Sequence, residues 1–237
     1  MSKRLNFFLV HLLCSIVIAF LLLIWVFNVW YPYPLAKALG VIDIIILLLI
    51  VDIIIGPMLC FIVYKTEKKT LKFDLMVVIF FQILAFSVGV YNLSEGRPVW
   101  IVYNQGNMDL VQRVEIITDD MKYALPVFQT IPMFGPEIAA VKTLGFNNES
   151  AEKAKSISFI QQPEKYILIN KEAMNIKKNI HKISELYKTN EKQKVDNLLL
   201  KHADVQGWLP LRATTKNMVV LLNIDNLKII SIVDLRY

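Results

Sequence analysis

Three long apolar runs fill the first part of the chain and constrain its fold more than any other feature of the sequence. They cover roughly residues 7–29, 41–64 and 75–91. A helix needs about 20 predominantly apolar residues to cross the hydrocarbon core of a bilayer, and about 17 is the lower limit. The runs therefore predict a membrane protein with three transmembrane α-helices within residues 1–91.

The remainder, residues 92–237, has the composition of an ordinary globular domain. Hydrophobic residues make up 55% of the whole chain, more than is usual for a soluble protein, but the excess lies in residues 1–91. Basic residues of the second part are interleaved with acidic ones, which is typical of solvated helix faces. The formal net charge of +6 therefore does not indicate a nucleic-acid partner.

The distribution of basic residues predicts the orientation of the chain in the membrane. Lys3 and Arg4 precede the first run, and four lysines fill the 65–74 loop after the second run. The loop between the first two runs offers only Lys37. Because basic loops stay on the cytoplasmic side, the N-terminus and the 65–74 loop are expected there. Three crossings then place residues 92–237 outside the cytoplasm, which in a bacterium is the periplasm.

One acidic residue, Asp52, lies in the middle of the second run, in the stretch VDIIIGPMLC that starts at residue 51. The surrounding Val, Ile, Leu and Phe residues contribute about −0.3 to −0.6 kcal/mol each to membrane insertion. One central aspartate costs about 2.5–3.5 kcal/mol on a similar scale. The run can therefore carry Asp52 and still insert, but the charge needs a partner or a function.

Small and polar residues at four-residue spacing predict where the helices pack. Asp52 and Gly56 share one face of the second helix, and Gln82 and Gly89 lie on one face of the third. Small residues let helix backbones approach closely, and polar side chains bond across such contacts. Pro57 removes a backbone hydrogen bond beside this face. These five residues are the candidate helix-packing or partner-binding residues.

Two interpretations of Asp52 stay open at this point. In the first, Asp52 bonds Gln82 or Ser15 inside the three-helix bundle, since buried polar groups usually find partners in their own protein. In the second, Asp52 faces a groove that receives a membrane helix of another protein.

Residues 92–237 predict a small α+β domain with an antiparallel sheet. Strand patterns cover residues 99–104 and 108–117, and a hairpin is centred on Asp225–Asn226. The stretch 137–144 suits a strand or a short helix. Helical patterns lie at about 148–159, 170–188 and 190–202.

No catalytic signature is present in the sequence. It contains no nucleophile elbow, zinc-protease motif, phosphate-binding loop or dinucleotide glycine pattern. The two cysteines, Cys14 and Cys60, lie inside apolar runs. We therefore expect a protein that is not an enzyme and that holds neither a metal nor a cofactor.

The order of several short segments resembles the type IV pilin accessory proteins of the TfpX/TfpZ family. The resemblance covers nearly the whole chain and is carried by Gly56-Pro57, KKTLKFDL (68–75), Gln82, Tyr91, Arg97-Pro98-Val99, FGPEIAAVKT (134–143), WLPLR (208–212) and the closing VDLRY. The residues that match the family pattern outside the helix-packing set are Lys72, Phe73, Asp74, Arg97 and Pro98.

This resemblance implies a multi-pass protein of the bacterial inner membrane that supports assembly or surface display of a type IV pilin without catalysis. The implied partners are the major pilin, the pilus assembly machinery and the lipid bilayer. Two alternatives stay open: a membrane-anchored periplasmic sensor or ligand-binding protein, and a membrane enzyme that modifies pilin.

Overall fold

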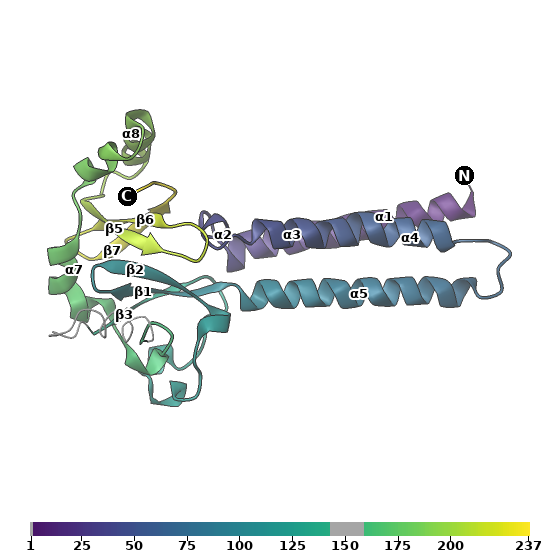
Figure 1. The fold of residues 1–237 in the computed structure, drawn as a ribbon, viewed down its shortest axis with the longest axis horizontal. Helices are drawn as coiled ribbons and strands as arrows, with labels where there is room; N and C mark the ends of the chain where they lie inside the picture. The colour runs from purple at the N-terminus through teal and green to yellow at the C-terminus, as the bar shows by residue number, and fades with distance from the viewer. Residues whose placement is uncertain (1, 143–158) are drawn as a thin grey trace. The chain divides into compact units, whose positions relative to one another are not determined.

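The computed structural model describes residues 2–142 and 159–237 (Figure 1). The chain divides into two compact units. The first contains Met1–Pro32 and Val41–Gly96, and the second contains Tyr33–Gly40 and Arg97–Tyr237. The segment that connects the first two long helices is thus part of the second unit.

The first unit consists of three long apolar helices, as predicted. Their segments are α1 (Lys3–Trp25) with the π-helical η1 (Val26–Trp30), α3 (Ile42–Leu49) with the π-helical η2 (Ile50–Ile55) and α4 (Gly56–Val63), and α5 (Leu71–Glu95). All three are long and apolar enough to span a bilayer, with mean hydropathies of 3.0, 2.9 and 2.2. They are therefore candidate membrane spans.

A hydrogen bond joins the C-terminal end of the first long helix to the C-terminal end of the third. Tyr31 is fully buried, and its hydroxyl donates a 2.8 Å hydrogen bond to the carbonyl of Leu93. Pro32 and Pro34 follow at once, and because proline lacks a backbone N–H they end the helical pattern.

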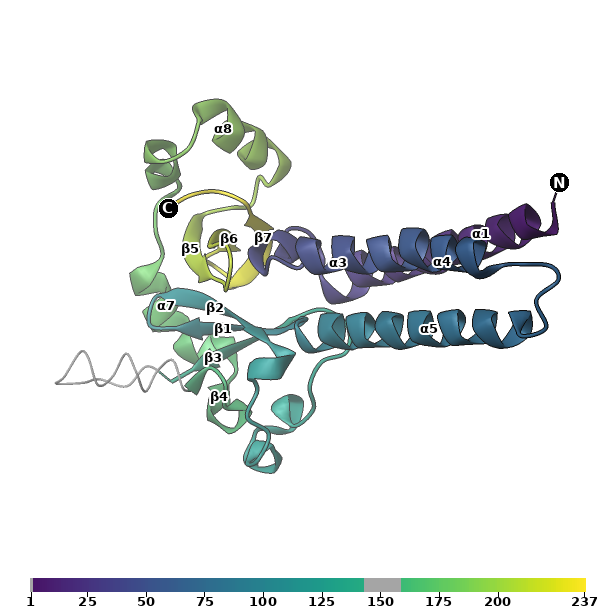
Figure 2. The same ribbon diagram turned by 45° about the vertical axis from the view of Figure 1, so that its right-hand side comes forward.

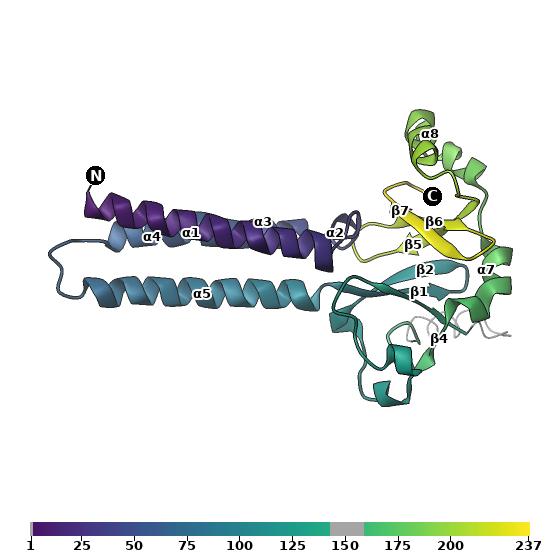
Figure 3. The same ribbon diagram turned by 180° about the vertical axis from the view of Figure 1, so that it is seen from behind.

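The second unit is built on a seven-stranded sheet with the order β4-β3-β1-β2-β5-β6-β7. Figure 2 shows β1 to β4 on one side, and Figure 3 shows β5, β6 and β7 from behind. The strands are β1 (Pro98–Asn104), β2 (Asn107–Gln112), β3 (Glu137–Val141), β4 (Tyr166–Ile167), β5 (Gly207–Arg212), β6 (Met218–Asn223) and β7 (Lys228–Val233).

The sheet is mixed, so the prediction of an antiparallel sheet was wrong. β1 pairs with β3 in parallel, and β2 pairs with β5 in parallel. Antiparallel neighbours need only a tight turn, as in β1–β2 and β6–β7, whereas parallel neighbours need a long crossover. The crossovers here are the long segments that follow β2 and β4.

Two apolar clusters form the core of the sheet domain. Trp100, Phe128 and Tyr166 lie in the first, where short 3-10 turns cover the sheet. Leu186, Val195 and Trp208 lie in the second, under the helical segments before β5. The covering turns and helices are η3 (Arg113–Glu115), η4 (Met121–Tyr123), η5 (Pro126–Phe128), η6 (Pro163–Lys165), η7 (Ile169–Glu172), α7 (Ala173–Asn179), η8 (Ile183–Lys188) and α8 (Lys192–Lys201).

The predicted helix over 170–188 was wrong in its extent. Its middle is interrupted at His181, whose backbone N–H and carbonyl both bond to the backbone of Trp208, at 2.9 and 3.0 Å. Gly207 allows this approach, because a Cβ there would lie 2.9 Å from the Ile180 side chain. The helix expected at 190–202 is present as α8, the 137–144 stretch contains β3, and the helix expected at 148–159 falls almost entirely outside the described residues.

The short connecting segment Tyr33–Gly40 is fastened to the sheet domain. It contains α2 (Leu35–Ala38), and the Ala38 carbonyl accepts hydrogen bonds from the backbone N–H groups of Thr215 and Lys216 at 3.1 and 3.0 Å. Lys37 forms a 2.5 Å ion pair with Asp234. The connection therefore belongs to the fold of the second unit.

Candidate functional site

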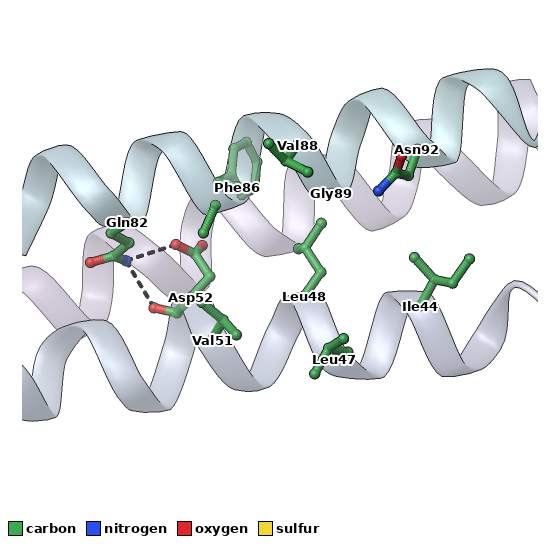
Figure 4. A pocket seen from close by; sticks show the side chains of 11 residues that line it. Ile44, Leu47, Leu48, Val51, Asp52, Gln82, Phe86, Val88, Gly89 and Asn92 are labelled. Carbon is green, nitrogen blue, oxygen red and sulfur yellow. Dashed lines mark hydrogen bonds between the residues drawn. The ribbon is translucent and has the colours of Figure 1, made fainter.

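A polar cluster joins the three apolar helices at one level. The Gln82 amide, on α5, donates to Asp52 Oδ1 at 2.7 Å and to the Asp52 backbone carbonyl at 3.0 Å (Figure 4). The same Nε2 lies 3.2 Å from Ser15 Oγ on α1. Ser15 and Asp52 are both buried. The structure thus brings together the aspartate of the second helix and polar residues from the two others.

The π-helical turn around Asp52 explains why its carbonyl accepts a side-chain bond. In a regular α-helix this carbonyl would accept from the N–H four residues later, which is that of Gly56. Here the Gly56 N–H bonds instead to the Val51 carbonyl, five residues back. The next residue is Pro57, which has no N–H to offer. The Gln82 amide therefore donates to the Asp52 carbonyl in place of a backbone N–H of the same helix.

The two glycines of the predicted packing face lie where the second and third helices meet. A Cβ added to Gly56 would overlap the carboxamide of Gln82. A Cβ on Gly89 would lie 2.5 Å from Cδ1 of Leu48. Gly56 therefore makes room for the polar contact, and Gly89 makes room for an apolar one.

A groove of about 350 Å³ runs between the second and third helices beside this cluster (Figure 4). Asp52 and Gln82 lie in its lining together with Asn92, and the other lining side chains are apolar. The complete lining is Ile44, Leu47, Leu48, Val51, Asp52, Gln82, Ala85, Phe86, Val88, Gly89 and Asn92.

Two oxygen atoms of the polar cluster have spare hydrogen-bonding capacity. Asp52 Oδ2 and Gln82 Oε1 are buried, and neither has a hydrogen-bond partner within residues 2–142 and 159–237. A buried acceptor left unpaired costs about 1–3 kcal/mol. The polar cluster therefore has the capacity to accept further hydrogen bonds at these two atoms.

The family-pattern residues are not part of the groove lining. Lys72 and Phe73 are exposed at the start of α5, where Asp74 forms an ion pair with Lys68. In the sheet domain Arg97 donates a 3.1 Å hydrogen bond to the Pro132 carbonyl, and Pro98 begins β1.

Sequence reasoning missed part of the groove wall. Leu48 and Ile44 precede Asp52 by four and eight residues, so helical periodicity already puts them on its face. Asn92 lies three residues after Gly89 and has the same signal. In the described part of the chain no three His, Cys, Asp or Glu side chains are placed to hold a metal ion.

Three candidate membrane spans with a largely apolar groove, followed by a mixed-sheet domain, indicate a membrane-associated protein. A model of the family described as fimbrial assembly protein FimB matches residues 1–40. The fimbrial assembly protein of serogroup I from Dichelobacter nodosus is 32% identical over 194 residues, which cover 79% of this chain and 76% of the relative. The serogroup E1 protein of that organism is 32% identical over 196 residues, with the same shares covered. No solved structure matches the chain.

The chain belongs to the family of fimbrial assembly proteins, since these relatives match it over more than two thirds of their length and of its own.

Proposed function

We propose that this protein is a non-catalytic accessory protein of the bacterial inner membrane that supports assembly or surface display of a type IV pilin, as TfpX/TfpZ proteins do. Membership in the fimbrial assembly family supports a role in pilus assembly. The three candidate spans support a site of action in the membrane. In this role the protein binds the pilin, assists its handover to the pilus assembly machinery and releases it unchanged.

The observation that carries the proposal is the groove with its two unpaired oxygens. Its apolar walls suit the side chains of a membrane helix. A helix that brings a hydrogen-bond donor to the depth of Asp52 Oδ2 and Gln82 Oε1 would gain a hydrogen bond to one of them. We therefore propose that the apolar helix of the pilin lies along this groove. A partner that supplies the missing donor gains an interaction that bulk lipid does not offer.

Site-specific photocrosslinking in cells tests the proposed contact. Val88 lines the groove on α5 and is 53% exposed, whereas Phe80 of the same helix is 61% exposed and is not part of the lining. A photoreactive residue at position 88 is expected to capture pilin, and the same residue at position 80 is the matched control. Equal capture from both positions, or none from position 88, contradicts the groove as the pilin site. Absence of pilin together with capture of a small ligand by the sheet domain would favour the sensor alternative.

The proposed orientation has its own test. We propose that the N-terminus and the 65–74 loop are cytoplasmic and that the sheet domain is periplasmic, because Lys and Arg gather on one side of the spans. A phosphatase that is active only in the periplasm is expected to be active when it is fused after Tyr237. A stable but inactive fusion contradicts this orientation.

A further inference from the structure

Val114, Met133 and Phe134 are among the large apolar side chains that are exposed on the sheet domain in the connection between β2 and β3. Val114 is 64% exposed, Met133 is 56% exposed and Phe134 is 74% exposed. Isolated exposed apolar residues are common on protein surfaces, but clustered ones mark protein or membrane contacts. The positions of these three therefore need an explanation.

All three lie within two residues of a group that is bonded to Arg97. The Arg97 carbonyl accepts a 2.9 Å hydrogen bond from the backbone N–H of Arg113, which precedes Val114. The Arg97 guanidinium donates a 3.1 Å hydrogen bond to the carbonyl of Pro132, which precedes Met133. The Arg97 side chain is itself buried. Two segments that are about 20 residues apart in sequence thus meet at one residue.

Arg97 follows directly after the helix cap of the third candidate span, because α5 ends at Glu95 and Gly96 is its C-cap. The apolar run of this span ends at Tyr91, the four helical residues that follow rise about 6 Å, and Arg97 comes two residues later. The headgroup layer on each side of a bilayer is about 5–8 Å thick. Given the proposed crossing, the groups bonded to Arg97 therefore lie near the outer edge of this layer.

We propose that Val114, Met133 and Phe134 form an interfacial anchor that inserts into the lipid headgroup region where the third helix leaves the membrane. Lipid is favoured over a protein partner because Arg97 lies two residues after the end of α5, so the residues bonded to it stay close to the end of this span whether or not a partner is present. The same connection also contains Tyr123 of η4, which is 71% exposed, with the Lys122 ammonium 5.0 Å from its ring centroid. Tyrosine and lysine are typical of membrane interfaces. The anchor rests on the proposed crossing by α5 but not on the proposed binding of pilin.

Depth-dependent quenching in vesicles tests the anchor. The full chain with Cys14→Ala and Cys60→Ala receives a single cysteine, labelled with an environment-sensitive dye, by Phe134→Cys or Val114→Cys. The matched control is Met174→Cys, at a residue 82% exposed on α7. Asn179, on the same helix, bonds to Tyr103 at the end of β1 that is far from Arg97. Because a strand of this length spans about 20 Å, the control helix contacts the sheet far from Arg97. Each protein is reconstituted at low density into phosphatidylethanolamine–phosphatidylglycerol vesicles that contain a lipid with a headgroup nitroxide.

Several-fold stronger quenching at positions 134 and 114 than at position 174, without pilin present, is the expected result. Equal quenching at all three positions, or none at positions 134 and 114, overturns the anchor. Shielding of the dye at position 134 only after purified pilin is added also overturns it, since the surface then belongs to a protein contact. If Phe134→Cys lowers the melting temperature of the parent protein, Met133→Cys takes its place. Failure of the crosslinking test above would leave these outcomes unchanged.

Discussion

The sheet domain and the three helices differ in how far they bury their own apolar side chains. In the sheet domain every residue of β1 is buried, and its apolar clusters are closed by the covering turns and helices. On α5 none of the most apolar 18 residues is buried, and Phe80 and Phe81 are each 61% exposed. The sheet domain thus obtains its stability from its own contacts, whereas the third helix depends on what surrounds it.

The buried acids of the two regions repeat this contrast. In the sheet domain Asp109 uses both oxygens, accepting bonds from Arg212 at 2.6 and 2.5 Å and from Asn104 at 3.3 Å. The hydrogen bonds to Asp109 raise the pKa of Arg212 above its ordinary value. Burial lowers this pKa, but by less. Between the helices Asp52 uses only one carboxylate oxygen. The first acid is fully engaged in the fold, whereas the second has one oxygen without a hydrogen-bond partner among the described residues.

The largest expected effect comes from breaking the complete pair of the sheet domain. Arg212→Leu leaves the Asp109 carboxylate buried without its counter-charge, which typically costs 3–5 kcal/mol, and we expect about 3 kcal/mol because Arg212 is only partly buried. Thermal unfolding of the purified chain in detergent measures the loss. Lys216→Leu, which breaks an exposed ion pair with Asp234, is the control and is expected to cost far less. Equal stability of the two variants contradicts the contrast.

The next effect tests the contact between the second and third helices. Gly56→Leu or Gly89→Leu forces a side chain into Gln82 or Leu48, and overpacking of this kind costs about 1–3 kcal/mol. Less intact protein in membranes and a lower melting temperature are expected. Ser87→Leu is the control, because Ser87 is exposed on α5 and is not part of the groove lining. Accumulation of all three variants at the level of the parent would contradict the claim that Gly56 and Gly89 lie in a helix–helix contact.

Asp52→Leu addresses the polar cluster alone. It removes the Oδ1 acceptor of the Gln82 amide, and an unpaired buried donor costs about 1–3 kcal/mol. The lower part of this range is expected, since the Asp52 backbone carbonyl and Ser15 Oγ still accept. The melting temperature should fall by less than in Gly56→Leu. Asp43→Leu, at an exposed position of the same span, should leave the melting temperature nearly unchanged.

The smallest effect concerns pH and the fastening of the Tyr33–Gly40 segment. Partial burial raises the pKa of Asp234, but hydrogen bonds from Lys216 and Lys37 outweigh it and lower the pKa below the ordinary value of 3.8. A depressed carboxylate pKa stabilises the fold above the unfolded value and loses this contribution as the pH falls through the folded value. The free energy of unfolding of the parent should therefore fall more than that of Asp234→Asn below about pH 4, by under about 1 kcal/mol because the lysines are exposed, and melting curves at several pH values measure the difference. Parallel curves for the two proteins would show that the ion pairs contribute nothing.

Local patterns were sufficient for the features that depend on neighbouring residues. Run length predicted the three long helices, and the apolar segments on either side of the turn pair Asp225–Asn226 predicted the β6–β7 hairpin. The parallel pairing of β2 with β5 was missed because it joins segments almost 100 residues apart and leaves no local signal. The break at His181 was missed because the apolar spacing favoured a helix, while the backbone of Trp208 took the hydrogen bonds that a helix would have used.

The candidate site divides in the same way. Helical spacing put Asp52 and Gly56 on one face and Gln82 at a similar depth, and the structure joins them. The π-helical turn forms because the Gly56 N–H donates its hydrogen bond to the Val51 carbonyl rather than to the Asp52 carbonyl, and no residue pattern predicts this. The groove itself depends on the spacing between two helices, and sequence alone does not set that distance.

The central claim is that Asp52 holds the bundle with one oxygen and recognises pilin with the other, and Asp52→Asn tests it most directly. The amide keeps Oδ1 as an acceptor for Gln82 but replaces the unpaired Oδ2 with an NH₂ group, which offers donors instead. Protein level in membranes and surface pilin are measured together in cells that carry this variant. Normal abundance of the folded protein with fewer surface pili is the predicted result. Normal abundance with normal pili would contradict the claim and leave Asp52 a structural residue of the helix bundle.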